Sequence, residues 1–106
     1  MQLDINDLKG LLGFGNTENK LPFEIGKAYL FRTVTHIELG RVDSICGKFV
    51  KIVDASWISH TGRYSECLLN GTIKESEPYP DYSIVNTDSL INSAPWGHDL
   101  PREPKK

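Results

Sequence analysis

The segment from Lys27 to Ile58 limits the possible folds more than any other part of the chain. It is rich in β-branched and aromatic residues, and Gly40 and Gly47 interrupt it. Because the interruptions are short, we expect consecutive strands to pair as an antiparallel meander. The predicted strands span residues 27–39, 41–46 and 49–58.

The third predicted strand changes phase along its length. Val50 and Ile52 alternate in one register, whereas Val53, Ala55 and Trp57 alternate in the other. A strand of this kind usually contains a bulge or bends sharply. Both faces of the first predicted strand are also partly apolar, so we expect both to be covered.

Helical spacing occurs at two places. Residues 5–12 predict a short amphipathic helix, followed by a connector to residue 22. This helix either packs on its own core or docks on a partner. Tyr64, Cys67 and Leu68 predict a second helix of about two turns, which the pair at residues 70–71 would end.

The last third of the chain predicts extended structure. Residues 72–83 run around two prolines, and 82–85 and 90–92 form a hairpin across a polar turn. Residues 96–106 read as a tail that leaves the body. We therefore expect one domain over residues 1–106, divided into a helix and connector (1–22), a β-rich body (23–95) and a C-terminal tail (96–106).

These elements predict an α+β fold that is mainly β. We expect a small antiparallel barrel, or two packed sheets, of about five strands with one short N-terminal helix and one short internal helix.

Composition excludes several classes of protein. The chain is 39% apolar and 25% charged, without an apolar run long enough to cross a bilayer and without the basic start of a signal peptide. We expect a cytoplasmic protein that does not enter membranes and whose Cys46 and Cys67 are reduced thiols in apolar sites.

The net charge is −2, and residues 71–101 hold one lysine against five acids, which argues against extended nucleic-acid binding.

Catalytic and metal-binding patterns are weak. The three histidines and two cysteines show no close repeat, so we expect no metal and no cofactor. Asp54, Ser59 and His60 are the residue types of a hydrolase triad, but neighbours on a strand point to opposite sides. We therefore expect no catalytic residue and no enzymatic activity.

Anion binding is the strongest site hypothesis. The start of the second helix offers Thr61, Gly62 and Arg63, a set suited to a phosphate. Alternatively, Thr61 caps the helix, Gly62 allows a turn and Arg63 pairs with Glu66. The full candidate ligand-binding set is Arg63, Thr61, Gly62, Ser59, Arg32, Arg41, Trp57 and Tyr64.

Four segments together resemble a family of small uncharacterised proteins of bacteria and their phages: YLFRTVTHIELGRV, DASWISHTGRYSE, EPYPD and APWGHDLPR. The resemblance covers residues 25–102 and implies a prokaryotic or phage setting, without an activity or site residues. The expected fold is more loosely similar to Sm-like and SH3-like small barrels.

The sequence thus favours a non-enzymatic binding or structural module that assembles into a homo-oligomer. The reason is that a short chain carries many aromatic residues but no set of catalytic residues. One alternative is a sensor or sponge for a small phosphorylated ligand such as a nucleotide. The other is an RNA-binding Sm-like ring.

Overall fold

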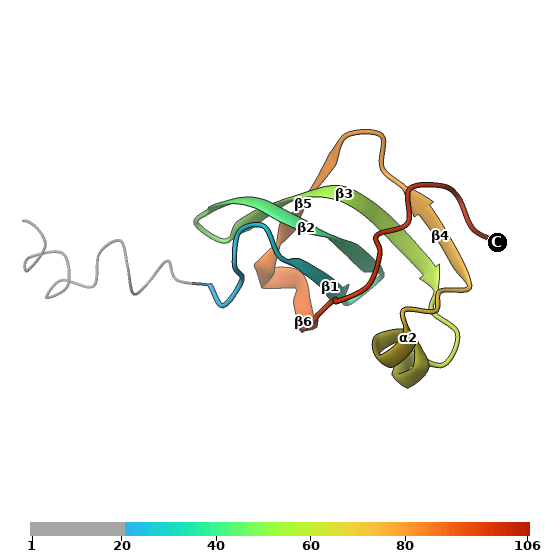
Figure 1. The fold of residues 1–106 in the computed structure, drawn as a ribbon. Helices are drawn as coiled ribbons and strands as arrows, with labels where there is room; N and C mark the ends of the chain where they lie inside the picture. The colour runs from blue at the N-terminus through green and yellow to red at the C-terminus, as the bar shows by residue number, and fades with distance from the viewer. Residues whose placement is uncertain (1–20) are drawn as a thin grey trace, which may run out of the picture.

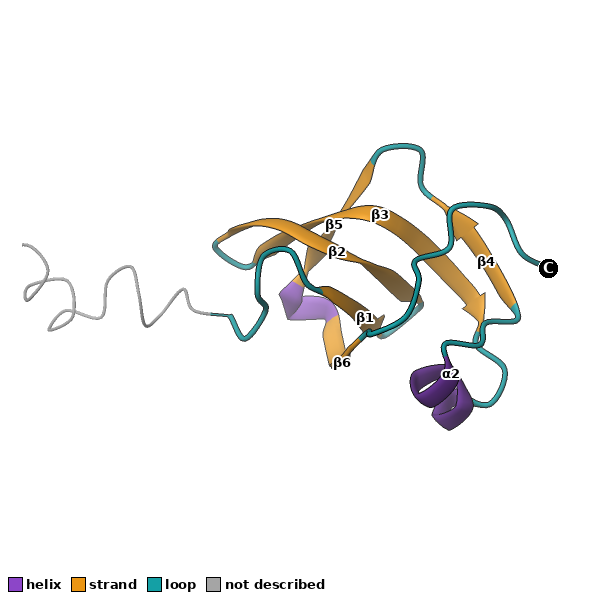
Figure 2. Ribbon diagram, in the orientation of Figure 1, coloured by secondary structure: helices purple, strands orange, loops and turns teal. Residues whose placement is uncertain are grey.

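The computed structural model describes residues 21–106 (Figure 1). These residues form a single antiparallel sheet of six strands with one α-helix, so the prediction of a mainly β fold is confirmed (Figure 2). The helix predicted at residues 5–12 lies outside the described residues. The elements are β1 (Ala28–Thr33), β2 (Ile37–Cys46), β3 (Phe49–His60), α2 (Tyr64–Asn70), β4 (Glu75–Pro78), β5 (Tyr82–Asn86), the 3₁₀ turn η1 (Thr87–Ser89) and β6 (Leu90–Pro95).

The sheet is organised around the long strand β3. The strand order is β4-β3-β2-β1-β6, and β5 also pairs with β3. One edge of β3 pairs with β2, while its other edge pairs first with β5 over residues 49–53 and then with β4 over residues 56–60. Asp54 lies between these two sections with a positive φ of 48°, where the register with β2 also shifts. The predicted irregularity in this strand is therefore confirmed as a bulge.

The single strand predicted over residues 27–39 is wrong, because it is two strands separated by a tight turn. The Thr33 hydroxyl donates to the carbonyl of His36 (2.8 Å) and accepts from the amides of Thr35 (3.3 Å) and His36 (3.0 Å). These side-chain hydrogen bonds compete with continued strand pairing. β-propensity alone does not distinguish this turn from a strand.

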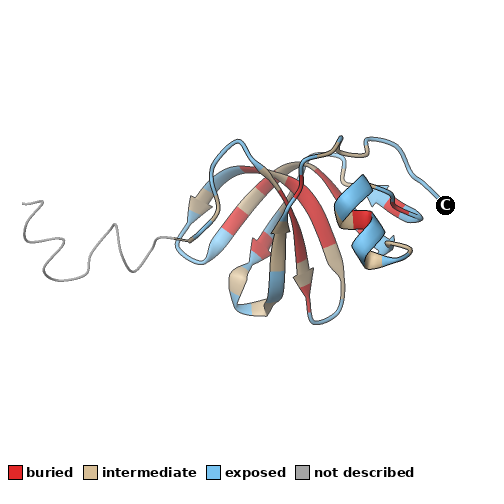
Figure 3. Ribbon diagram, turned by 60° about the horizontal axis from the view of Figure 1, so that its bottom comes forward, coloured by how far each residue is buried: buried red, intermediate tan, exposed pale blue. Residues whose placement is uncertain are grey.

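Both faces of β1 are covered, as predicted: Tyr29 and Phe31 belong to one hydrophobic cluster and Leu30 to another. Figure 3 shows the buried residues along the strands. The strand cluster consists of Tyr29, Phe31, Val42, Val50, Ile52, Ala55 and Val85. The helix cluster joins strand residues to α2 and to the segments that follow it, and consists of Leu30, Leu39, Ile58, Cys67, Ile73 and Trp96.

Helix α2 matches its prediction closely. It ends at Asn70, and Gly71 adopts a left-handed φ of 75° and donates its amide to the carbonyl of Cys67 (2.8 Å). Both cysteines are free thiols, and Cys67 is buried. Cys46, predicted to fill an apolar site, is instead exposed beside the β2–β3 turn. No helix within residues 21–106 is long and apolar enough to span a bilayer.

The hairpin predicted from residues 82–85 and 90–92 is also wrong. β5 pairs with β3 and β6 pairs with β1, so the two strands diverge. The connection between them is the turn η1, where the Asn86 side chain accepts from the amide of Asp88 (3.0 Å) and Thr87 donates its amide to Lys48 (2.9 Å). This turn carries the chain from one edge of the sheet to the other.

Residues 96–106 do not leave the body as predicted but cross back over the sheet. Trp96 is buried in the helix cluster, and the Ser56 hydroxyl donates to the carbonyl of Pro101 (3.0 Å). Ser76 and Lys105 then exchange two backbone hydrogen bonds of 2.9 Å. The prolines prevent regular structure here, but they do not prevent docking.

Candidate functional site

The β1–β2 turn, residues 33–36, separates two hollows in the surface. The turn is held from within by the Thr33 hydroxyl, so the side chains of Val34 and Thr35 are free to face outward. Val34 is 76% exposed. It lines both hollows.

The first hollow, named here the Arg32 hollow, has a volume of about 360 Å³ and is open to solvent. It lies between the β1–β2 turn and the end of β3. Trp57 is 42% exposed there and Ile91 is 57% exposed, so apolar surface is left available. Its lining is Arg32, Thr33, Val34, Thr35, His36, Ile37, Trp57, Ile58, Ser59 and Ile91.

Arg32 keeps its charge available in this hollow. Its Nε donates to the side-chain oxygen of Asn92 (3.0 Å), and its guanidinium lies 5.6 Å from the ring centroid of Tyr64. None of the ion pairs within residues 21–106 includes Arg32. The guanidinium is thus oriented by a neutral amide and an aromatic ring, which leaves it able to bind an anion.

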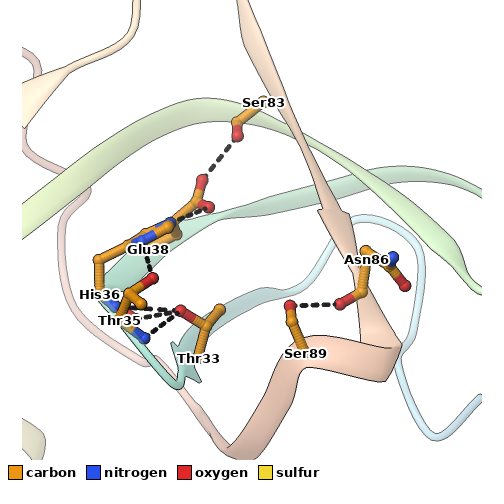
Figure 4. Close-up of polar contacts among 7 residues, drawn as sticks. All are labelled: Thr33, Thr35, His36, Glu38, Ser83, Asn86 and Ser89. Atoms are coloured by element: carbon orange, nitrogen blue, oxygen red, sulfur yellow. Dashed lines mark hydrogen bonds and ion pairs between the residues drawn. The ribbon is translucent and has the colours of Figure 1, made fainter.

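The second hollow, the Glu38 hollow, lies on the other side of the turn and has a volume of about 350 Å³. Its polar groups form a connected chain (Figure 4). The Ser83 hydroxyl donates to Glu38 Oε1 (2.6 Å), and His36 Nε2 lies 3.1 Å from Glu38 Oε2. The lining is Thr33, Val34, Thr35, His36, Glu38, Ile84, Val85, Asn86 and Ser89.

The carboxylate of Glu38 is the most buried charged group in this region, with a side chain only 8% exposed. Its effect reaches Tyr79: burial raises the pKa of that phenol, and the negative charge of Glu38 raises it further. His36 extends the chain to the Thr35 hydroxyl, which lies 2.9 Å from Nδ1.

The predicted ligand-binding residues do not all lie at one place in the structure. Arg32, Trp57 and Ser59 line the Arg32 hollow, and the Tyr64 ring lies beside the guanidinium. Arg41 is elsewhere, because its Nη1 pairs with Asp54 Oδ2 at 2.6 Å.

The start of α2 agrees with the structural interpretation at Gly62, which allows the turn, but differs from it at Thr61 and Arg63. Thr61 does not cap the helix: its hydroxyl donates to the carbonyl of Gly62 (2.8 Å), and Arg63 occupies the N-cap without a side-chain hydrogen bond. Gly62 has a φ of 77°, so the chain turns before the helix begins. Arg63 is exposed and joins no ion pair within residues 21–106, and neither it nor Thr61 lines the Arg32 hollow.

His36, Glu38 and Ser83 were missed as site residues by sequence reasoning. The spacing of His36 and Glu38 contained a signal, since residues two apart on a strand share a face. Ser83 lies 45 positions from Glu38, and no sequence pattern links the two residues. Within residues 21–106 there is no group of three or more His, Cys, Asp or Glu side chains that could hold a metal ion.

Comparison with protein-family models, with curated proteins and with solved structures yielded no match to this chain.

Proposed function

We propose that the protein is a non-enzymatic binding module, and that the Arg32 hollow binds a small phosphorylated ligand that carries an aromatic ring, such as a nucleotide. The observation that carries the proposal is the pairing of Arg32, which has no acid partner within residues 21–106, with the half-exposed indole of Trp57. A guanidinium binds phosphate oxygens through directed hydrogen bonds. An exposed indole offers a surface for stacking a base.

Neighbouring groups support the same class of ligand. Ser59 adds a hydroxyl at the rim, although it also donates to Glu75 (3.3 Å), and Val34 and Ile91 supply apolar contact. The lining is thus divided between apolar side chains and polar groups, and small-ligand sites combine apolar contact with a few placed polar groups.

Binding is favoured over catalysis by the geometry of the turn. The hydroxyl, imidazole and carboxylate of Thr35, His36 and Glu38 form a chain that resembles a hydrolase relay. However, the backbone amides of Thr35 and His36 already donate to the Thr33 hydroxyl. These two amides are therefore not free to stabilise the oxyanion that develops in acyl transfer.

The test is a titration of the full chain with nucleoside monophosphates, in which binding is measured by isothermal titration calorimetry and by thermal shift. Arg32→Ala should weaken binding at least about tenfold, because a charged hydrogen bond to phosphate is lost. Trp57→Ala should weaken it about tenfold through lost stacking. The matched control is Arg63→Ala, an exposed arginine outside the hollow. Equal losses in the Arg32 and Arg63 variants would contradict the proposal, as would the absence of binding by any nucleotide.

We further propose that the curled sheet is a small barrel of the SH3-like kind. In support, the strand cluster draws on β1, β2, β3 and β5, and η1 joins strands at opposite ends of the pairing order. The bond from Ser83 on β5 to Glu38 on β2 spans two strands that are not neighbours in the sheet. Such a bond is expected where a sheet curls around its own interior.

A second function, self-assembly, is favoured by the outward face of β3 and β5. Phe49, Tyr82 and Ile84 are exposed there, at alternate positions of paired strands. Two ion pairs border this face, Lys48–Asp88 and Lys51–Asp43, at 2.8 and 3.9 Å. A face with equal numbers of cations and carboxylates suits a second copy of itself across a two-fold axis.

Light scattering coupled to gel filtration tests self-assembly. The full chain should elute as a dimer at about 100 µM, well above the Kd of a weak dimer, and Phe49→Glu should return it to a monomer. Leu69→Glu, which changes an exposed apolar residue on α2, is the control and should leave the mass unchanged. A monomer in the unaltered protein at this concentration would rule the interface out.

A further inference from the structure

The Glu38 carboxylate is a buried charge whose surroundings do not neutralise it permanently. Its side chain is 8% exposed, and it contacts the Ser83 hydroxyl and the His36 imidazole. The Tyr79 phenol is also close, because hydrogen bonding to Glu38 is one of the causes that raise the pKa of that phenol. No lysine or arginine within residues 21–106 pairs with it. Removing a carboxylate from water is costly unless an opposite charge compensates it.

The charged and titratable groups near Glu38 are few. Burial and the neighbouring Glu38 raise the pKa of Tyr79, so its phenol can hydrogen-bond to the carboxylate but brings no opposite charge. His36 can offset it only while protonated, and its side chain is 38% exposed. On η1, Asp88 is an acid that pairs with Lys48. Within residues 21–106, Glu38 therefore has hydrogen-bond partners but no lysine or arginine to balance its charge.

The carboxylate also lines a hollow rather than a closed core. The hollow has a volume of about 350 Å³, large enough for a short alkyl chain with a polar head. Val34, Ile84 and Val85 supply apolar lining, whereas Asn86 and Ser89 place oxygen acceptors near the rim. Apolar walls that lead to a buried acid are suited to a cation on an alkyl stem.

We propose that the Glu38 hollow is a second binding site, distinct from the Arg32 hollow, and that it takes an organic ammonium or guanidinium cation. The charged head lies against Glu38, and the alkyl stem lies along Val34 and Ile84. An organic cation is favoured over a metal ion because a single carboxylate supplies too few oxygen ligands, and no metal-binding group of side chains occurs within residues 21–106.

The test is an amide chemical-shift titration of the full chain with n-butylammonium, and with 1-butanol as the neutral analogue of the same shape. The ammonium should give saturable shifts at Val85, Asn86 and Ser89 with a Kd in the millimolar range, about what so small a ligand can reach. Butanol should give much weaker shifts. Equal shifts with butanol would overturn the proposal, because the site would then recognise apolar surface and not charge.

Two variants separate the role of charge from the stability of the fold. Glu38→Gln should weaken n-butylammonium binding at least about tenfold, while Asp43→Asn, a control on the same strand whose carboxylate is half exposed, should not.

If Glu38→Gln fails to fold, Val34→Lys is the second variant, since Val34 is at the exposed rim and a lysine there would compete for the carboxylate. Val34→Gln is its neutral control. Undiminished binding in either Glu38→Gln or Val34→Lys would overturn the proposal. Nucleotide binding by the Arg32 hollow is measured separately, so the two proposals can fail independently.

Discussion

The two hydrophobic clusters differ in how much of the chain each one needs. Every buried member of the strand cluster belongs to a strand, and those strands are neighbours in the sheet. The helix cluster also requires Cys67 in α2, Ile73 after it and Trp96 at the start of the C-terminal segment. The difference teaches that the buried residues of one face come from the strands alone, whereas those of the other face come in part from the helix and the C-terminal segment.

Phe31→Ala should produce the largest loss of stability. Phe31 is fully buried in the strand cluster, and the centroid of its ring lies 5.2 Å from that of Phe23 and 6.0 Å from that of Tyr29. Removing the ring should lower the free energy of unfolding by about 3–5 kcal/mol. Urea denaturation measures this change as a single cooperative transition. A loss below about 1 kcal/mol would show that the strand cluster does not hold the fold.

Ile73→Ala should have a smaller and more local effect. Its side chain is 7% exposed in the helix cluster, and we expect a loss of about 2–3 kcal/mol. Hydrogen exchange should accelerate first at the amides of Gly71 and Lys74, which bond to Cys67 and His60. Leu69→Ala, at a position 77% exposed, is the control. Uniform acceleration across all strands would remove the distinction between the clusters.

Gly40→Ala tests how closely the sheet packs beside the strand cluster. An added Cβ would lie 3.0 Å from the Cβ of Ile52 and 3.1 Å from that of Ala55. We expect a loss of about 1–3 kcal/mol from overpacking. Gly97→Ala, where a Cβ would have no neighbour within 4 Å, is the control. Thermal denaturation should show a lower Tm for the first variant alone.

Ser56→Ala tests the attachment of the C-terminal segment. It removes the 3.0 Å bond to Pro101 and should cost about 1 kcal/mol. The amide of Lys105, which bonds to Ser76, should exchange faster while the amides of β1 are unaffected. Unchanged exchange at Lys105 would mean that the segment is held by Trp96 without help from Ser56.

Alkaline pH should weaken the helix cluster slightly. Burial raises the pKa of the Cys67 thiol above its ordinary value of 9.0, so the folded state holds this proton more tightly than the unfolded state. Stability from this group is complete below the unfolded pKa and falls as the pH rises through the folded pKa. The free energy of unfolding should therefore decline above about pH 9, and less steeply in Cys67→Ala. An identical slope in both proteins would contradict this assignment.

Local patterns predicted the strands and α2, because alternation and helical spacing depend on neighbours in sequence. The break at Thr33 was missed because Thr, Val and Thr have strand propensity, while the turn depends on three bonds to one hydroxyl. The docking of residues 96–106 was missed for a different reason. Its partners, such as Ser56 and Ser76, are far away in sequence and leave no periodic signal.

The candidate site was predicted only in part. Arg32, Trp57 and Ser59 were identified by residue type, but the sequence placed the centre of the site at Arg63, which does not line the hollow. Glu38 was missed because an acid in a strand is usually solvated. Its partner Ser83 lies on β5, 45 positions away in sequence, and donates to Oε1 at 2.6 Å.

In the β1–β2 turn, the residue that stabilises the turn is different from the residues whose side chains face the solvent. Thr33 provides the internal bonds, whereas Val34 and Thr35 project toward the two hollows and take no part in the hydrophobic clusters. Both positions are thus open to randomisation in a directed-evolution library, with Thr33 held constant. Selection at two neighbouring codons would then alter the ligand preference of both hollows at once, on a scaffold whose folding those codons scarcely affect.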